Sequence, residues 1–422
     1  MYSFEVRARA DDGRVRRAGV PAVVYWIGLS SLLADISAES VASALPVFLY
    51  SVLQLSPLEV GFMDGLYQGG AALVRVAAAW VADRRSNNRG VAFLGYALSA
   101  LSRIGFLLSG SAGLLLAMAS LCIDRVGKGI RTAPRDALIA GHSPADQLGA
   151  AFGVHRAMDA VGAFVGPLVG AGILWLLPFG FDWLFAASLV FGIAGLVVFR
   201  TRVTEPAAPP QAEAPDTTAR APGLWRTIAA DRPFVRLTVL AAFLSMFTIS
   251  DGLVYLSMQR ASGFDERLLP LMFALTALLF LATAAPIGRL ADRIGPIAVF
   301  LGGYALLACL YLWLAFGAPK GWPSIAAIVS LLGVHYAATD GVLAATATRT
   351  LDARVRATGL AILATAIGLT RIGSSSVYGW LWERAGQSTA VTTYAVGMSC
   401  CCAIAMLVLR GRAAPATPVL PA

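Results

Sequence analysis

Residues 288–295 read GRLADRIG, and residues 80–90 read WVADRRSNNRG. Each segment follows an apolar run and carries an Asp-Arg pair, which begins at Asp83 in the first segment and at Asp292, 209 residues later, in the second. A carboxylate beside an arginine at a membrane surface can cap a nearby helix N-terminus and pair with other arginines. The recurrence predicts that the chain contains two related halves.

The spacing of other acids supports the same division. Asp35 and Asp251 lie 216 residues apart, and so do Asp124 and Asp340. Between the two sets, residues 203–222 read VTEPAAPPQAEAPDTTARAP, with five prolines and no large apolar residue, which is typical of a flexible linker. A repeat of this kind is expected of a secondary transporter that is built from two bundles.

The composition is that of a membrane protein. Of the 422 residues, 58% are hydrophobic and 14% are charged, whereas a soluble domain carries about 25% charged residues. Because a transmembrane helix needs about 20 largely apolar residues, the chain has room for twelve. We therefore predict an all-α membrane protein with twelve transmembrane helices. They are expected at residues 22–52, 58–82, 91–109, 113–133, 148–177, 181–199, 234–258, 268–290, 296–318, 322–346, 357–382 and 388–409.

The distribution of Lys and Arg predicts the orientation. With the N-terminus inside, the outer loops hold only four such residues: Arg260, Arg267, Lys320 and Arg384. This asymmetry favours cytoplasmic termini, and it explains the net charge of +9 without nucleic acid as a partner. The expected domains are a tail (1–21), a six-helix bundle (22–199), a cytoplasmic linker (200–233), a second bundle (234–409) and a tail (410–422).

The loop motifs resemble those of a known family. GRLADRIG is similar to the G-x-L-A-D-R-x-G loop of the major facilitator superfamily, and the first copy differs from it at Ala79 and Ser86. The resemblance implies two six-helix bundles related by a pseudo-two-fold axis, with a cytoplasmic latch that is made and broken during transport. The latch candidates are Asp83, Arg84, Gly288, Asp292, Arg293 and Gly295.

The fourth and fifth predicted helices carry two further resemblances. Residues 125–129, RVGKG, fit the R-x-x-x-G pattern of the fourth helix, and residues 153–170 fit the fifth-helix antiporter pattern except for Ala171. That pattern comprises Gly153, Gly162, Gly166, Pro167 and Gly170. Glycines let membrane helices approach closely and proline favours a kink, so this seam suits rocking, although packing alone could also explain it.

Residues 124–140 close the fourth helix and begin the next loop. We expect Pro134 to end the helix, and Lys128 and Arg131 to reach toward the inner membrane surface. Arg131 and Arg135 are therefore candidates for the gate.

Seven acids and five arginines are among the charged residues inside the predicted spans. At about 3 kcal/mol each they are too costly to stay unpaired and dry, so they must pair, face water or be neutral. Most lie in the first half, which favours proton coupling there. The candidates for coupling or buried pairing are Asp35, Glu39, Asp64, Asp124, Arg125, His155, Arg156 and Asp159.

Asp35 and Glu39 lie four residues apart, on one face of the first helix near mid-membrane. Two carboxylates this close favour proton binding by one of them, and Arg125 is their expected partner. A permanent ion pair between the first and fourth helices is the alternative. On the fifth helix we expect an Arg156–Asp159 pair, with His155 as a weaker relay candidate.

Polar residues of the second half are expected to line a substrate cavity. They are Asp251, Tyr255, Tyr336, Asp340 and Arg371. Arg371 could bind an anionic substrate or neutralise Asp340, and the sequence does not separate these roles.

The sequence carries no convincing catalytic motif. Residues 127–129, GKG, lack the spacing of a nucleotide-binding loop, and the cysteines and histidines lack metal-ligand spacing. We expect no enzyme and no cofactor, with the proton gradient as the energy source. The expected function is efflux of a small molecule by antiport, from a monomer in the plasma membrane whose partners are its solute and lipid. A proton-coupled importer and a non-transporting membrane sensor are the alternatives.

Overall fold

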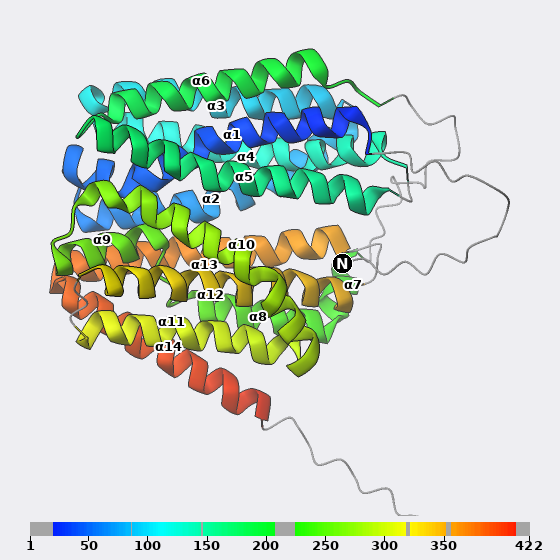
Figure 1. The fold of residues 1–422 in the computed structure, drawn as a ribbon. Coiled ribbons are helices and arrows are strands. Elements are labelled where there is room, and N and C mark those ends of the chain that lie inside the picture. The colour runs from blue at the N-terminus through cyan, green and yellow to red at the C-terminus, as the bar shows by residue number, and fades with distance from the viewer. Residues whose placement is uncertain are drawn as a thin grey trace, which may run out of the picture.

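The computed structural model describes residues 20–85, 87–144, 147–206, 224–317, 321–351 and 356–410, and the regular elements in these ranges are helices (Figure 1). Most of the predicted N-terminal tail, residues 207–223 of the predicted linker and nearly all of the C-terminal tail lie outside the described residues. Within these ranges the predicted all-helical fold class is confirmed.

The first half contains six long helices. They are α1 (Ala22–Val47), which continues into the π-helical turn η1 (Phe48–Val52), α2 (Pro57–Arg85), α3 (Asn88–Ala112), α4 (Leu114–His142), α5 (Leu148–Leu176) and α6 (Phe181–Arg202). The second half begins with the short α7 (Leu224–Ala230). It continues with α8 (Arg232–Ser245), α9 (Asp251–Ser262), the 3-10 turn η2 (Glu266–Leu268), α10 (Leu269–Ile294), α11 (Pro296–Phe316), α12 (Gly321–Thr350), α13 (Arg356–Ala385) and α14 (Gln387–Arg410).

Nine helices within the described ranges are long and apolar enough to cross a membrane. The remaining three predicted spans correspond to α2, α4 and the α8–α9 pair. Helices α2 and α4 have 29 residues each, but ionisable side chains interrupt their apolar sequence, while α8 and α9 are each too short alone. The count of twelve spans therefore stays a prediction.

The predicted span 234–258 is not one helix. It is interrupted at residues 246–250, and α9 restarts with Ser250 as its N-cap. The Tyr311 hydroxyl accepts from the Ile249 backbone N–H at 2.7 Å and also contacts the Ile249 carbonyl oxygen at 3.2 Å. Ser374 donates to the Thr248 carbonyl at 3.0 Å. Side chains thus satisfy the backbone groups that the break exposes, which is how non-helical backbone is tolerated at membrane depth.

The expectation that Pro134 ends the fourth helix is wrong. Helix α4 continues through Pro134 to His142, eight residues further. A proline inside a helix removes one backbone hydrogen bond but does not by itself end a packed helix. As a result, Arg135 and Asp136 belong to α4 and not to a loop.

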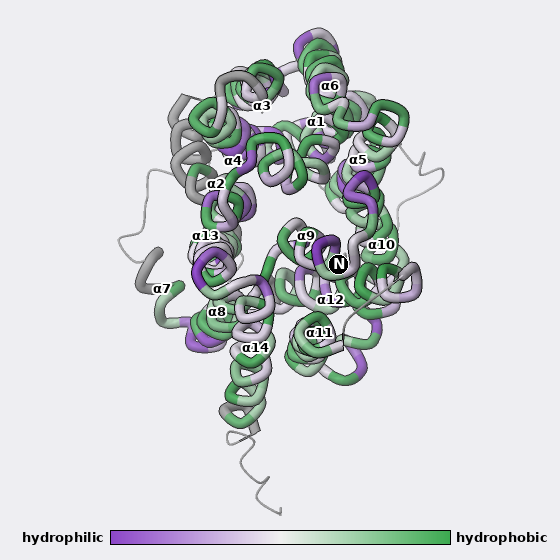
Figure 2. Tube along the Cα trace, turned by 90° about the vertical axis from the view of Figure 1, so that its left-hand side faces the viewer, coloured by the Kyte–Doolittle hydropathy of each residue, from purple (hydrophilic) through white to green (hydrophobic). Residues whose placement is uncertain are grey.

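The same packing pattern recurs in both halves. Helix α1 packs on α5 and α6, as α8 packs on α13 and α14. Likewise α2 and α3 pack on α4 as α10 and α11 pack on α12. Figure 2 looks along the bundle and shows the helices as a ring, in which α2 adjoins α13 on one side and α5 adjoins α10 on the other, two contacts that join the halves.

Glycines bring α5 close to α1. A Cβ atom added to Gly162 would lie 2.7 Å from the Leu32 carbonyl oxygen, and one added to Gly166 would lie 2.9 Å from Glu39 Cβ. A Cβ atom added to Gly170 would lie 3.1 Å from the Ser40 carbonyl oxygen. Pro167 lies inside the continuous α5. Gly153 differs from the expected seam, because it is exposed and an added Cβ would meet no atom within 4 Å.

Candidate functional site

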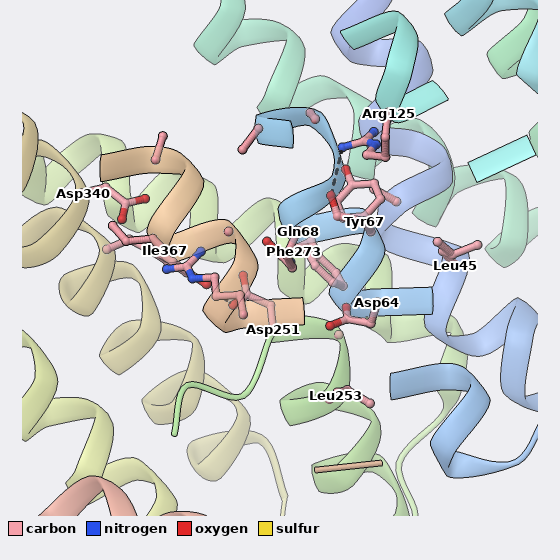
Figure 3. A pocket seen from close by; sticks show the side chains of 18 of the residues that line it. Leu45, Asp64, Tyr67, Gln68, Arg125, Asp251, Leu253, Phe273, Asp340 and Ile367 are labelled. Atoms are coloured by element: carbon pink, nitrogen blue, oxygen red, sulfur yellow. Dashed lines mark hydrogen bonds between the residues drawn. The ribbon is translucent and has the colours of Figure 1, made fainter. Parts of the chain in front are cut away.

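A cavity of about 580 Å³ lies between the two halves (Figure 3). Helices α1, α2 and α4 of the first half and α9 to α13 of the second half contribute to its wall. Seven ionisable acidic and basic residues line it: Glu39, Asp64, Arg125, Lys128, Asp251, Asp340 and Arg371. Six of these were predicted as coupling or cavity residues. In Figure 3, Arg125 lies over Tyr67 on one side of the cavity, and Asp340 lies on the opposite side.

The halves are joined at one end of the bundle, where α1, α5, α9 and α13 end and where α2 and α10 begin. We call this the closed end. Four polar contacts cross between the halves there. They are Ser51 Oγ to Glu266 Oε2 (2.8 Å), the Leu58 N–H to Glu383 Oε2 (3.3 Å), the Arg260 guanidinium over the Tyr50 ring (4.4 Å) and the Arg267 guanidinium over the Trp175 ring (5.3 Å).

Glycines also let α2 and α13 approach closely across this interface. A Cβ atom added to Gly65 would lie 2.8 Å from the Ile372 carbonyl oxygen, and Gly368 lies against Gly69. Further along, the Thr365 hydroxyl reaches the Ala72 carbonyl oxygen at 3.4 Å. By contrast, Glu39 and Lys128 in the cavity wall are 27% and 33% exposed, and Asp340 is exposed. The cavity therefore admits water in its middle, beyond the closed end.

The first-half wall contains a buried charge triad. Asp124 accepts a hydrogen bond from Arg103 at 2.6 Å and is also paired with Arg125. The Arg125 guanidinium stacks 3.9 Å from the centre of the Tyr67 ring, and Arg103 also donates to Ser37 at 3.2 Å. Arg125 was expected to pair with the acids of the first helix, and this is wrong, since Asp124 is the carboxylate that it contacts.

The acids of α1 pair with other residues of α4. Lys128 Nζ lies 3.7 Å from Glu39, and Arg131 donates to Asp35 at 3.1 Å. Arg131 is only 2% exposed, so the expectation that it reaches the inner surface is wrong. The reason is geometric: residues 128 and 131 follow residue 124 on one face of α4, and both pair with acids of α1.

The fifth-helix cluster also differs from its prediction. Asp159 lies 3.7 Å from Arg135 of α4 and 3.3 Å from His155, while Arg156 is exposed. The expected Arg156–Asp159 pair is absent from the ion pairs of the described residues, and Arg135 takes its place. Arg135 is 6% exposed and also bonds Asp136 at 3.0 Å. It therefore lies inside the first bundle and not in a surface loop.

Two cavity acids are held by neutral hydroxyl groups. Asp64 accepts from Ser375 of α13 at 3.0 Å, a bond that crosses between the halves. Asp251 accepts from the Tyr336 hydroxyl, and it occupies the first residue of α9, where the helix dipole favours a negative charge. Neither acid has an ion pair with a described cation within 4.0 Å.

Two predicted cavity residues have no direct partner for their side chains among the described residues, and one predicted residue lies outside the cavity wall. Across the described residues, Arg371 and Asp340 form neither an ion pair within 4.0 Å nor a hydrogen bond, and the Arg371 Nε is a buried atom without an acceptor. Tyr255 does not line the cavity, because its hydroxyl bonds Thr276 and its ring packs edge-on to Phe273 at 5.0 Å.

The predicted latch residues of the second half lie at the end of α10. Asp292 and Arg293 are exposed in its last turn, and Gly288 precedes them in the same helix. Gly295 joins α10 to α11 with φ of 97°, a backbone conformation that favours glycine. In the first half, Asp83 and Arg84 lie in α2, but their side chains fall outside the described residues.

Sequence reasoning missed three contributors to the site. Lys128 was expected at the surface and instead pairs with Glu39, while Arg103 and Tyr67 were not connected to Asp124 and Arg125. A signal was present for Lys128, because residues 124, 128, 131 and 135 recur at helical spacing on one face of α4.

The comparisons with known proteins agree with this architecture. Residues 27–375 match the sequence model of the Major Facilitator Superfamily. An uncharacterised MFS-type transporter of Methanocaldococcus jannaschii is 28% identical over 374 residues, which cover 87% of this chain and 90% of that protein. An uncharacterised protein of Mycobacterium tuberculosis is 26% identical over 374 residues, which cover 86% and 88% of the two chains.

Solved structures show the same fold at low sequence identity. The nucleoside transporter NupG has a TM-score of 0.73 at 14% identity, over 92% of this chain and 100% of its own. A bacterial homologue of the human lysosomal transporter Spinster has a TM-score of 0.69 at 16% identity, over 93% and 98%. The superfamily match covers most of the sequence and both halves of the fold, and the chain therefore belongs to the major facilitator superfamily.

Proposed function

We propose that this protein is a secondary active transporter that carries a small solute through the central cavity by alternating access. The observation that carries the proposal is the charged cavity between two similarly packed halves, closed at one end by contacts that cross between them. Intramembrane ionisable residues that face such a cavity are expected at a solute or ion path.

The proposed orientation places the closed end outside. Both termini are then cytoplasmic, α8 and α9 together form one broken span, and the bundle has twelve spans in the plasma membrane. The scarcity of Lys and Arg in the turns at the closed end supports this orientation. The described conformation would then face inward.

We further propose that transport is coupled to protons and that the protein exports its solute. Asp64 and Asp251 support coupling, because each is a cavity carboxylate held by a hydroxyl group and not by a cation. Proton binding would remove the cost of keeping such a charge away from water. Glu39 is the third candidate, since it is partly exposed and lies 3.7 Å from Lys128. The resemblance of residues 153–170 to the fifth-helix antiporter pattern supports export.

A reporter cysteine tests alternating access without a known solute. Leu253 lines the cavity and is 1% exposed, behind the closed end. In a background without Cys122, Cys309 and Cys400–Cys402, we expect Leu253→Cys to react slowly with a membrane-impermeant maleimide added from outside. A Ser51→Cys/Glu266→Cys disulfide should stop that reaction at position 253, and reductant should restore it.

A matched control distinguishes closure from a general effect of cross-linking. Ser37 of α1 and Ser188 of α6 belong to the same half, and their hydroxyls are 3.0 Å apart. A disulfide between cysteines at these positions should leave the labelling rate unchanged. If the inter-half disulfide has no effect, or if position 253 is never labelled from outside, alternating access at this cavity is wrong.

Everted vesicles test coupling and direction. A solute found by a thermal-shift screen should dissipate an imposed ΔpH if the protein is an antiporter. Uptake into right-side-out cells with external alkalinisation would instead indicate a proton-coupled importer. Glu39→Gln and Asp64→Asn should each reduce the proton flux relative to the solute flux if these acids carry the proton. An unchanged pH dependence in both variants would exclude them as coupling groups.

A further inference from the structure

Among the described cations of the membrane interior, Arg371 differs from the others in its contacts with carboxylates. Arg103, Arg125, Lys128, Arg131 and Arg135 each have a carboxylate within 4.0 Å. Arg371 lines the same cavity, yet no such carboxylate contacts it among the described residues, and its Nε is buried without an acceptor. An unpaired guanidinium group in a membrane cavity is costly, and the planar fork of its N–H groups matches an oxyanion. This arrangement indicates a place for an anionic group.

The surroundings of Arg371 are acidic. Asp64, Asp251 and Asp340 all line the cavity, and each lies close enough to interact electrostatically with Arg371. Hydroxyl groups bond two of these carboxylates, and Asp340 has no hydrogen bond to a described residue. One guanidinium therefore stands among three carboxylates, and this excess of negative charge favours a cationic group beside them.

A ligand of a single charge would satisfy only part of this arrangement. A simple anion at Arg371 would be repelled by the three carboxylates, and a simple cation among the carboxylates would leave Arg371 unpaired. A ligand with both charges can satisfy both sides. The rings of Phe273, Tyr304 and Tyr336 line the same cavity and offer apolar surface to the rest of the ligand.

From these contacts we infer that the transported solute is a small zwitterion of the amino acid type. Its protonated amine lies among Asp64, Asp251 and Asp340, and its carboxylate binds Arg371. A cavity of about 580 Å³ is within the usual size range for small-molecule sites. This inference rests on the proposed transport function, and it adds the chemical class of the solute.

A binding series tests the inference on the purified full-length chain. The probes are the ω-amino carboxylates from glycine to 6-aminohexanoate and the twenty α-amino acids, each compared with an amine and a carboxylate of matched length. Binding is measured by calorimetry and by thermal stabilisation. At least one zwitterion should bind tenfold or more tightly than both of its matched single-charge probes.

Variants assign each charge. Arg371→Gln should remove the tenfold difference in affinity between the zwitterion and the matched amine. Asp340→Asn should reduce the difference in affinity between the zwitterion and the matched carboxylate. Arg371→Lys keeps the charge but loses the fork, so it should restore part of the affinity. Arg289→Gln is the control, because Arg289 is exposed on α10 and does not line the cavity. If a variant fails to fold, the preference of the wild-type protein for zwitterions over single-charge probes still tests the inference.

Two results would overturn it: a matched amine or carboxylate that binds as tightly as every zwitterion, or no zwitterion that binds at 10 mM or below. The labelling of position 253 needs no ligand and reports alternating access separately. If labelling shows alternation and the zwitterions do not bind, the solute class is wrong and the transport function stands. If labelling shows no alternation, the transport function itself is wrong.

Discussion

Asp124 contacts two guanidinium groups, those of Arg103 and Arg125, and all three side chains are buried. The carboxylate therefore compensates two positive charges at once, in an interior where an unpaired charge is expensive. Arg125 also stacks on Tyr67, which fixes the guanidinium in the cavity wall. At the residue scale, Asp124 is thus the centre of the first-half charge network.

Replacement of Asp124 should therefore destabilise the protein strongly. We expect Asp124→Asn to lower the free energy of unfolding by about 3–5 kcal/mol, because it leaves two buried cations without their carboxylate. Arg103→Gln should cost less, since Arg125 still pairs with Asp124. Thermal unfolding in detergent measures both. Asp265→Asn is the control, because its pair with Arg267 is about one-third exposed and should matter little. Equal effects of the buried and exposed variants would contradict this account.

The presence of buried charges could be predicted from the sequence, but their pairing could not. The acids at positions 35, 39 and 124 are visible as interruptions of apolar runs. Which cation meets which acid depends on the rotation and axial shift of α4 against α1, and these are set by packing. For that reason Glu39 pairs with Lys128 and Asp35 with Arg131, which lie three and six residues beyond the expected partner Arg125.

At the scale of elements, the contact between α1 and α5 depends on three glycines, and this gives a second prediction. Gly162→Ala should destabilise the protein by about 1–3 kcal/mol, because the new methyl group would lie 2.7 Å from the Leu32 carbonyl oxygen. Gly153→Ala should be neutral or slightly stabilising, since nothing lies within 4 Å and alanine favours a helix. Thermal unfolding of the two variants distinguishes a packed seam from general helix propensity.

The break between α8 and α9 gives a third prediction. Tyr311→Phe removes the hydroxyl that contacts both backbone groups of Ile249, so we expect a loss of about 1–3 kcal/mol in the free energy of unfolding. Tyr25→Phe is the control, because Tyr25 is exposed. Similar stability of the two variants would show that the break needs no support from Tyr311.

The sequence could not predict this break, since the apolar run from 234 to 249 continues across it. It is set by tertiary contacts with Tyr311 and Ser374, which lie about 60 and 125 residues later in the chain. By contrast, Gly295 could be recognised as a turn residue from its place between two apolar runs, and it adopts a positive φ. Local backbone requirements are visible in a sequence, whereas contacts between distant residues are not.

At the scale of the whole molecule, the two halves could be predicted from the recurrence of GRLADRIG-like segments and of acids about 210 residues apart. Which end of the bundle is closed could not be predicted, because the proposed alternating-access cycle requires the same sequence to form both states. The contacts at the closed end are few and partly exposed. Such contacts can be broken at small cost, as a gate requires.

The last prediction concerns this equilibrium between states. Glu266 accepts a hydrogen bond from Ser51 at 2.8 Å across the closed end. In the Leu253→Cys reporter, we expect Glu266→Ala to raise the labelling rate from outside by about three- to tenfold. This corresponds to the loss of roughly 1 kcal/mol from a partly buried, charge-assisted bond that only the closed state makes. Ser51→Ala should have a similar effect, and the double variant should not exceed either single one by much.

The control for this prediction is another carboxylate at the same end. Glu59 accepts from the Ser56 backbone N–H at 2.8 Å, entirely within the first half. Glu59→Gln weakens the start of α2 but removes no bond between the halves, so labelling at position 253 should stay near the wild-type rate. An equal rise in both variants would mean that the closed end loosens by local unfolding. A rise in Glu266→Ala alone would mean that the halves separate as bodies, because only a bond between them then sets the rate.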